Sequence, residues 1–258
     1  MHPILFSIGN FNIYTYGVFI ASAFFLGIGL AVKEAKKEGI DPQKILDLSY
    51  YILIAAIVGS RIFYVIVNIR YFMENPLEII KIWSGGLVFY GGFVFGIVVV
   101  IYFFKKNNMP LWKTADILAP SIPIGQMVGR LGCFFAGCCY GRPTNLPWGI
   151  TFSNPTSLAK LYVPLHPTQL YSSLSGLMIF FILIIMRRHK KFNGQLIWTY
   201  VLLYSVGRFI IEFLRSDERG FFMDILSTSQ VISIILFITA ITMLIKLKGN
   251  ILPQSPQR

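Results

Sequence analysis

The stretch 129–141 joins an arginine at membrane depth to all three cysteines of the chain. Arg130 stands near the end of a long apolar run, and Cys133, Cys138 and Cys139 follow it. A guanidinium at membrane depth costs several kcal/mol unless something compensates its charge, so we expect Arg130 to be functional. Its natural counterpart is an anion, either a carboxylate on a neighbouring helix or the phosphate of a lipid.

The spacing of the cysteines leaves more than one role open. Cys138 follows Cys133 by five positions and is adjacent to Cys139, which fits no common zinc spacing. A disulfide on the outer face is one alternative, and buried thiols that pack as small apolar side chains are the other. The packing role is favoured, and no metal site is predicted.

Two further arginines, Arg61 and Arg208, also lie in apolar segments. Each intramembrane arginine has a structural alternative, which is to pair with a carboxylate and hold two helices together. Glu212 follows Arg208 by four residues and shares its helix face, and Asp116 is available to Arg130. Three arginines against two such carboxylates leave unmatched positive charge, which favours an anionic ligand.

Composition places these residues in a multi-spanning, all-α integral membrane protein. The 258 residues are 55% hydrophobic and only 13% charged, about half the charged share of a soluble domain. The start of the chain has no basic region or small-residue cleavage site, so no removable signal peptide is expected. Most segments approach the ~20 residues that cross the hydrocarbon core, although the fifth is short. Seven spanning segments are predicted, at about 14–32, 49–69, 85–104, 117–135, 170–186, 196–213 and 225–245.

The net charge of +12 is explained by topology and does not require a nucleic-acid partner. With the N-terminus outside, fourteen basic residues fall in inner loops and six in outer loops, so the chain is predicted to be N-out and C-in. Anionic inner-leaflet lipid is a sufficient partner for the excess charge. The remaining arginines, Arg61, Arg130 and Arg208, lie on the second, fourth and sixth segments, which all run outward. They are therefore expected in the outer half of the membrane.

The chain is predicted to be a single multi-spanning domain, 1–258, without internal repeats. Its longest non-spanning stretch, 137–167, follows the fourth segment on the outer side and is rich in turn-forming residues. It ends in the polar sequence His-Pro-Thr-Gln-Leu-Tyr at 166–171, just before a spanning segment. Aromatic residues within it are expected at the lipid interface, namely Trp148, Phe152 and Tyr162.

Motifs along nearly the whole length resemble the bacterial phosphatidylglycerol–prolipoprotein diacylglyceryl transferase family. Gly-Arg-Leu-Gly at 129–132 is weak evidence alone, but its combination with the motifs at 166–171 and 207–215 in this order is specific. The motifs that carry the resemblance are Tyr-Thr-Tyr-Gly at 14–17, Gly-Ser-Arg at 59–61, Gly-Gly-Leu-Val-Phe-Tyr-Gly-Gly at 85–92, Gly-Arg-Leu-Gly at 129–132, His-Pro-Thr-Gln-Leu-Tyr at 166–171 and Gly-Arg-Phe-Ile-Ile-Glu-Phe-Leu-Arg at 207–215.

The resemblance implies transfer of the diacylglyceryl group of phosphatidylglycerol to the lipobox cysteine of a prolipoprotein signal peptide. A thioether forms and glycerol phosphate is released, in the bacterial cytoplasmic (inner) membrane, with no cofactor or metal and with membrane lipids as further partners. Arg130 and Arg208 are implied to handle the phospholipid, and Tyr90 stands where better-known members have a histidine. The predicted catalytic residues are Arg130, Arg208 and Tyr90, and the predicted substrate-binding residues are Tyr16, Arg61, Gly91, His166, Gln169, Tyr204, Glu212 and Arg215.

The sequence departs from the family pattern and leaves rival functions to weigh. Besides Tyr90, Cys133 replaces an asparagine and Cys138 a glutamate of the family signature. A phenol, with an ordinary pKa of about 10, is a poor base, so the group that activates the thiol is not identified. One rival is a membrane transporter or lipid-binding protein with an arginine anion site, but its inverted repeats are missing. Another is a thiol–disulfide oxidoreductase, which lacks the usual Cys-x-x-Cys pair.

Overall fold

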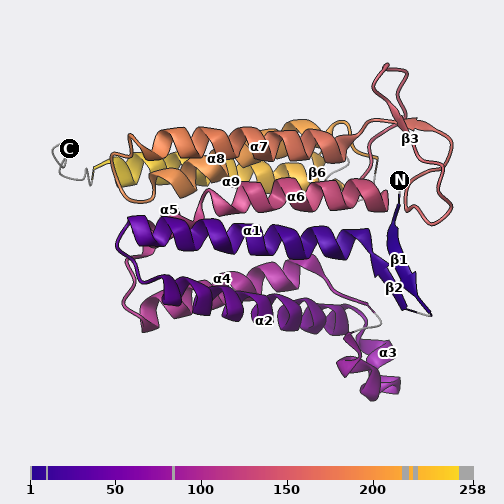
Figure 1. Cartoon of the computed structure of the whole chain (residues 1–258), viewed down its shortest axis with the longest axis horizontal. Helices are drawn as coiled ribbons and strands as arrows, with labels where there is room; N and C mark the ends of the chain where they lie inside the picture. The colour runs from indigo at the N-terminus through magenta and orange to yellow at the C-terminus, as the bar shows by residue number, and fades with distance from the viewer. Residues whose placement is uncertain (1, 10, 83–84, 217–220, 223–225, 250–258) are drawn as a thin grey trace. The chain divides into compact units, whose positions relative to one another are not determined.

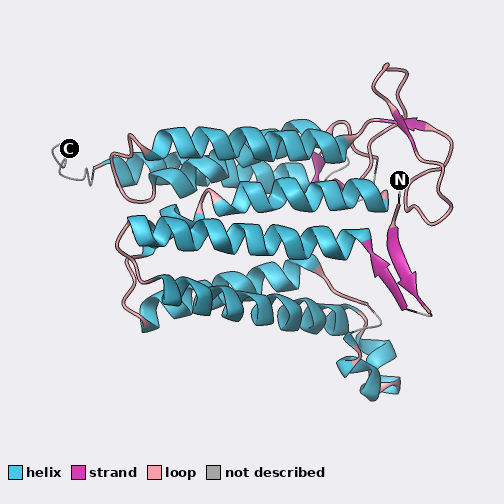
Figure 2. Ribbon diagram, viewed as in Figure 1, coloured by secondary structure: helices cyan, strands magenta, loops and turns pink. Residues whose placement is uncertain are grey.

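The computed structural model describes residues 2–9, 11–82, 85–216, 221–222 and 226–249. These residues form an all-α membrane protein with short two-stranded sheets outside its long helices (Figure 2). The helices are α1 Thr15–Lys37, α2 Pro42–Val67, α3 Ile69–Glu74, the 3₁₀ helix η1 Pro76–Ile80, α4 Phe89–Lys106, α5 Leu111–Leu118, α6 Ser121–Ala136, α7 Thr168–Arg187, α8 Gln195–Glu212 and α9 Thr228–Lys248. The strands are β1 Ile4–Ile8, β2 Phe11–Tyr14, β3 Ile150–Thr151, β4 Pro164–Leu165, β5 Phe221–Phe222 and β6 Leu226–Ser227.

Within the described residues, five helices are long and apolar enough to cross a membrane. They are α1, α2, α4, α7 and α9, and they match five of the seven predicted segments. Helices α6 and α8 lie in the other two predicted segments. They are not among the five, because α6 has only 16 residues and α8 carries the charged residues Arg208 and Glu212. Large apolar side chains on the long helices are exposed, such as Phe25 and Ile238, as expected of surfaces that face lipid. The multi-pass membrane class is therefore confirmed, while the count of seven spans stays a prediction.

The structure divides one predicted segment and starts another one residue later than predicted. The fourth segment, 117–135, is not one helix, because the chain turns at Ala119 and Pro120 between α5 and α6. Proline lacks the N–H that a continuous helix needs and clashes with the preceding turn. The first segment was expected to begin at about Tyr14; α1 begins at Thr15, and Tyr14 itself pairs with Ile4 in a β1–β2 hairpin.

The described chain divides into two compact units, residues 32–114 and residues 1–31 with 115–258. In the first, α2 and α4 lie side by side (Figure 1), and they pack closely because glycines face each other at their contact. A Cβ added at Gly59 would lie 2.6 Å from the carbonyl oxygen of Gly91. Gly91 and Gly92 are buried at the same contact, so larger side chains would separate the two helices.

Arg61 of α2 is buried and forms hydrogen bonds within this same unit. Its Nε donates to the carbonyl of Ile79 at 2.8 Å, and its Nη1 donates to Gly85 at 2.7 Å. Its guanidinium also lies 5.5 Å from the ring centres of Tyr64 and Phe72. These backbone acceptors and aromatic rings account for a buried arginine without any anionic ligand. Substrate binding by Arg61 stays a prediction, and its charge no longer supports the argument from unmatched arginines.

The second unit contains the start of α1 and the helices α6 to α9, which lie side by side in Figure 1. Small residues bring α1 and α6 together, since a Cβ added at Gly132 would lie 2.8 Å from the Cβ of Phe19. Along the rest of the bundle, α6 packs on α7, α7 on α8, and α8 on α9. This series of contacts brings the arginine motifs of α6 and α8 to one part of the unit.

Asp116 of α5 holds the start of α8 and is not the partner of Arg130. Its carboxylate accepts hydrogen bonds from the backbone N–H groups of Gly194, Leu196 and Ile197 at 2.8–3.0 Å. Lys190 lies 3.7 Å away. The carboxylate is nearly fully buried, and these N–H groups are the ones that a helix leaves unpaired at its first turn. The suggested Asp116–Arg130 pair is therefore replaced by a helix cap.

The segment 137–167 has a small core of its own. Phe152, Ala159 and Leu165 are buried together, with Tyr140 and Ile150 against them. Strands β3 and β4 pair across this core. The expectation of an interfacial position is thus wrong for Phe152, which is 2% exposed, whereas Trp148 and Tyr162 are exposed. Of the other sequence predictions, Arg219, Arg258 and Ile225, the start of the seventh segment, lie outside the described residues.

Candidate active site

Arg130 lies half-buried on α6 and differs from the other two intramembrane arginines in its surroundings. Within the described residues, no hydrogen bond or ion pair reaches its guanidinium. A charged group in such a place is costly unless a ligand neutralises it. The structure therefore leaves Arg130 available to an anion, and its role in catalysis stays a prediction.

Arg208 of α8 has the carboxylate partner that its helical spacing suggested. Its Nη2 lies 2.6 Å from Oε2 of Glu212 and donates a hydrogen bond to Ser229 of α9 at 2.9 Å. The same carboxylate oxygen lies 3.8 Å from Nε of Arg215, and Ser227 donates to the other oxygen at 3.0 Å. One buried carboxylate thus faces two guanidiniums, and its ion pair fixes the direction of Arg208.

A narrow cavity of about 20 Å³ brings the two arginines of the motifs together. Arg130 and Arg208 both line it, together with Tyr204, which lies one helical turn before Arg208 and stacks on Tyr200. The remaining lining residues are Gln126, Ser172, Ser175, Gly176, Ile179, Gly207 and Ile211. The cavity therefore combines two cations with hydroxyl and amide groups, which is a composition suited to phosphate oxygens.

Close packing of α7 against its neighbours forms the walls of this cavity. A Cβ added at Gly176 would lie 2.9 Å from the carbonyl oxygen of Pro123, and Ser173 donates a hydrogen bond to Met127 of α6 at 3.1 Å. On the other side, Gly207 of α8 faces the hydroxyl of Ser175. Small residues at both crossings let three helices approach each other at the depth of the arginines.

The His-Pro-Thr-Gln-Leu-Tyr motif links the start of α7 to the turn after α6. Gln169 and Thr168 are fully buried and donate 2.8 Å hydrogen bonds to the carbonyls of Cys138 and Cys139, respectively. His166 contacts the Tyr171 hydroxyl at 3.3 Å. That hydroxyl also accepts a 2.8 Å hydrogen bond from Trp148. Gln169 thus positions the cysteine turn.

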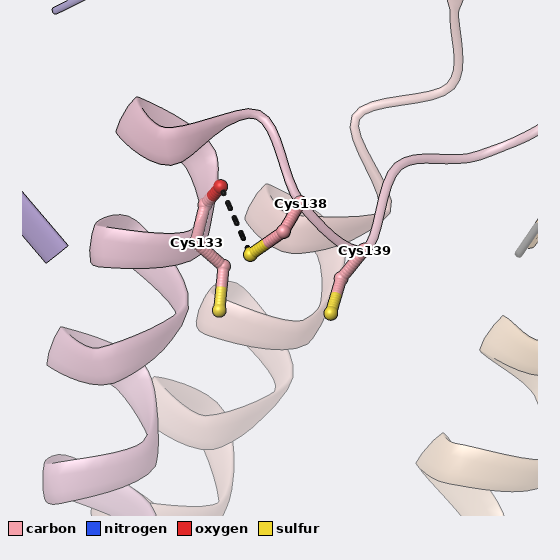
Figure 3. A group of neighbouring side chains, drawn as sticks. All are labelled: Cys133, Cys138 and Cys139. Atoms are coloured by element: carbon pink, nitrogen blue, oxygen red, sulfur yellow. Dashed lines mark hydrogen bonds between the residues drawn. The ribbon is translucent and has the colours of Figure 1, made fainter. Parts of the chain in front are cut away.

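The three cysteines lie together at the end of α6, although their spacing indicated no such cluster (Figure 3). Their sulfur atoms all lie within 4.8 Å of one another, and none of the three forms a disulfide within the described residues. The pKa of the Cys139 thiol is lowered, because Cys133 and Cys138 hydrogen-bond to it and Arg215 lies beside it. The pKa of Cys138 is raised by its hydrogen bonds with the other two thiols.

Tyr16, in the first turn of α1, belongs to the same surroundings. Its ring lies 3.4 Å from a Cβ added at Gly132, and it interacts electrostatically with Arg130 and the cysteines. The other two predicted site residues, Tyr90 and Gly91, begin α4 in the unit 32–114. Gly91 serves the α2–α4 contact, whereas Tyr90 is 51% exposed and its hydroxyl has no hydrogen bond within the described residues. Their roles in substrate binding and catalysis stay predictions.

Sequence reasoning missed the polar wall of the cavity and the meeting of the thiols. Gln126, Ser172 and Ser175 belong to no motif that marks them, although Gln126 precedes Arg130 by one helical turn on α6. The thiols meet because Gly137 ends α6 with a left-handed φ of 76°, and the chain turns back on Cys133. A glycine at the end of an apolar segment gives no such information by itself.

Fold and site together define a multi-pass membrane protein with two arginines at one cavity, and sequence comparisons identify its family. The family model described as prolipoprotein diacylglyceryl transferase matches residues 3–246. A phosphatidylglycerol–prolipoprotein diacylglyceryl transferase of Clostridium tetani is 40% identical over 93% of this chain and 96% of its own. Proteins of the same description from Finegoldia magna and Bacillus velezensis are 40% and 36% identical, covering 98% and 96% of this chain and 98% and 94% of theirs.

This chain belongs to the prolipoprotein diacylglyceryl transferase family. Its class is therefore that of a transferase, an enzyme of lipoprotein biosynthesis. The resemblance drawn from the motifs is confirmed.

Proposed function

We propose that this protein transfers the diacylglyceryl group of phosphatidylglycerol to the lipobox cysteine of a prolipoprotein, in the bacterial cytoplasmic membrane. The descriptions of its relatives name both substrates. The observation that carries the proposal for this chain is the pair of arginines, Arg130 and Arg208, at one cavity. Arg130 has no protein partner among the described residues, which leaves its charge for a phosphodiester.

The arginines act on the donor lipid. The diester phosphate of phosphatidylglycerol binds between Arg130 and Arg208, whose planar guanidiniums stay protonated and match phosphate oxygens in pairs. As the bond from the glyceryl carbon to the phosphate oxygen breaks, charge builds on the departing glycerol phosphate. Preorganised positive charge at that position lowers the barrier, because it stabilises the charge where it develops.

Glu212 and Ser229 keep Arg208 in place for this task. Nη2 of Arg208 makes both the 2.6 Å ion pair with Glu212 and the 2.9 Å hydrogen bond with Ser229. Arg208 also lines the cavity. A larger apolar groove, about 230 Å³, lies between α8 and α9, and its lining includes Phe209, next to Arg208 in sequence. An acyl chain of the donor fits the character of this groove, since its lining is almost wholly apolar.

The acceptor is the thiol of the lipobox cysteine, which reacts only as a thiolate. Its attack on the glyceryl carbon forms the thioether. Arg130 supports this step too, because a nearby guanidinium favours an anionic sulfur. Given the N-out orientation, the site and the segment 137–167 lie toward the outer face, where a signal peptide presents its lipobox.

Arginine-to-lysine variants test the role of the guanidiniums. Arg130→Lys and Arg208→Lys keep a positive charge but lose the planar pair of donors, so each should reduce the rate about 10²–10³-fold. The measurement is transfer of label from phosphatidylglycerol to a lipobox peptide by purified protein. Arg70→Lys, an exposed arginine on α3, is the matched control and should keep the wild-type rate. A wild-type rate from folded Arg130→Lys would overturn the proposal.

A further inference from the structure

The three thiols at the end of α6 are held in place by the backbone around them. The N–H of Cys138 donates to the carbonyl of Cys133 at 3.1 Å, so the chain folds back over the last turn of the helix. Cys139 has a left-handed φ of 60°, a conformation that a residue with a side chain adopts at a cost. Gln169 and Thr168 then fix the carbonyls of Cys138 and Cys139 from α7. Such surroundings orient the three sulfurs toward one place.

The separation of the sulfurs fits a tetrahedral metal site. Zinc–sulfur bonds of about 2.3 Å place the sulfurs of a tetrahedron about 3.8 Å apart. The three sulfurs already lie within 4.8 Å of one another (Figure 3), so shifts of about 1 Å or less would complete the geometry. Among the described residues, no histidine or carboxylate joins the cluster. Three protein ligands and one open position are the arrangement of a catalytic zinc ion.

Charge also favours a cation with thiolate ligands at this place. Three thiolates and one Zn²⁺ carry a net charge of −1, which needs a positive neighbour in a half-buried site. Arg215 hydrogen-bonds to Cys139, and Arg130 lies one helical turn before Cys133 and interacts with it electrostatically. The donor-binding arginine and the cysteine cluster are therefore neighbours within one unit.

We propose that Cys133, Cys138 and Cys139 bind a Zn²⁺ ion whose fourth coordination position takes the acceptor thiol. This inference rests on the proposed transferase function and deepens it. It supplies the activating group that the sequence did not identify, because a thiol that coordinates zinc is deprotonated outright. An ordinary thiol, with a pKa of about 8.5, is mostly protonated near neutral pH and reacts slowly.

The step balances without an oxidant or reductant. The lipobox thiol releases its proton to solvent as its sulfur binds zinc. An electron pair of that sulfur forms the bond to the glyceryl carbon of phosphatidylglycerol, while the bond from this carbon to the phosphate oxygen breaks. The electrons of the broken bond stay with the glycerol phosphate, whose charge Arg130 and Arg208 stabilise. The thioether product is neutral and a weaker ligand than a thiolate, so it leaves the metal.

Cobalt substitution tests the site through a spectrum, without the donor lipid. The full-length protein is stripped with a chelator and titrated with Co²⁺ alone. One Co²⁺ per chain is expected, with the visible bands of tetrahedral cobalt and sulfur-to-cobalt charge transfer. A lipobox peptide should then increase the charge-transfer band by about one third, as three thiolates become four, and a peptide with serine in place of cysteine should not.

Variants connect the spectrum to the cysteines. Cys138→Ser and Cys139→Ser should each weaken Co²⁺ binding by more than about 100-fold, beyond the range for residues that only support a metal ligand. Tyr162→Phe, an exposed change in the same segment, should leave binding unchanged. Thermal unfolding of the apo variants verifies that they are folded. Thr168→Val removes only the hydrogen bond that supports the turn at Cys139. This variant should bind Co²⁺ more weakly than wild type but more tightly than the serine variants.

The outcomes separate this inference from the transferase proposal. Absence of stoichiometric Co²⁺ or Zn²⁺, or a cobalt spectrum that the cysteine peptide does not change, overturns the zinc site. Binding of Cu(I) but not of Co²⁺ or Zn²⁺ also overturns it. If transfer from phosphatidylglycerol persists in the metal-free protein, the zinc site is overturned while the transferase function stands. Failure of transfer in protein that binds cobalt and responds to the peptide instead contradicts the transferase proposal.

Discussion

Two arginines that look equivalent in the motifs differ once their neighbours are known. Arg130 has no ion pair within the described residues, whereas Arg208 is paired with Glu212 at 2.6 Å. In the proposed site, the ligand phosphate would meet one guanidinium without an ion pair, that of Arg130, and one held in a fixed direction, that of Arg208. Glu212 also lies 3.8 Å from Arg215, so this carboxylate connects Arg208, which lines the cavity, with the arginine beside Cys139.

Tyr90 raises a question at the residue scale, because it stands where the resemblance drawn from the motifs implies a histidine. Its ring is about half exposed at the start of α4. Tyr90→Phe should cost about tenfold in transfer rate, the worth of one neutral hydrogen bond of 0.5–1.5 kcal/mol. Single-turnover transfer from labelled phosphatidylglycerol measures this loss, and Tyr90→His in the same assay shows whether the site still accepts the family's base.

A loss of about 10²–10⁴-fold from Tyr90→Phe would contradict this expectation, since that is the range for a general acid or base. It would also weaken the case for zinc as the group that activates the thiol. An unchanged fold, verified by thermal unfolding, is needed for either reading.

At the scale of elements, capping by a distant side chain determines where α8 begins. Asp116 of α5 accepts three backbone N–H groups at the start of α8, 78 to 81 residues later in the chain. Because α8 carries Tyr204, Arg208 and Glu212, its register sets the cavity. A change at the opposite end of the helix from the arginine is therefore expected to affect the site through helix position.

Asp116→Ala should lower the free energy of unfolding by about 3 kcal/mol, because it leaves Lys190 without its buried partner and three N–H groups uncapped. Thermal unfolding in detergent measures the change, and hydrogen exchange should show lost protection at Gly194, Leu196 and Ile197. Asp47→Ala is the matched control, since Asp47 is exposed on α2 and its loss should stay within about 0.5 kcal/mol. Equal stability of the two variants would refute the capping role.

At the scale of the whole molecule, the distribution of basic residues determines the expected orientation in the membrane. Fourteen basic residues in predicted inner loops against six in outer loops favour the N-out, C-in arrangement. This orientation matters for function, because the proposed acceptor reaches the enzyme as a signal peptide with its lipobox near the outer face. The segment 137–167, with its own buried core, would then cover the site from outside.

Cysteine labelling tests the orientation with Asn145→Cys and Lys36→Cys, both at exposed positions. The three native cysteines are first changed to serine, so that only the new thiol reacts. A membrane-impermeant maleimide should modify position 145 in intact cells and position 36 only after lysis. Labelling of position 36 in intact cells, with position 145 protected, would reverse the topology and place the site on the inner face.

The sequence by itself determined the membrane class, most of the spanning segments and the family, because these depend on composition, local periodicity and motif order. It also located Arg130 and the Arg208–Glu212 pair, since residues four apart on a helix are neighbours whatever the tertiary structure. The prediction from sequence missed the helix break at Pro120, where a proline without a backbone N–H interrupts a continuous apolar run.

Only the tertiary structure decided which charges are already engaged. Arg61 donates to carbonyls 17 to 25 residues away, and Asp116 caps a helix about 80 residues later. The meeting of Cys133, Cys138 and Cys139 likewise depends on a left-handed turn and on buried donors from α7. Such contacts join segments that are distant in sequence, and their partners are chosen by how the helices pack, which no local pattern of residues records.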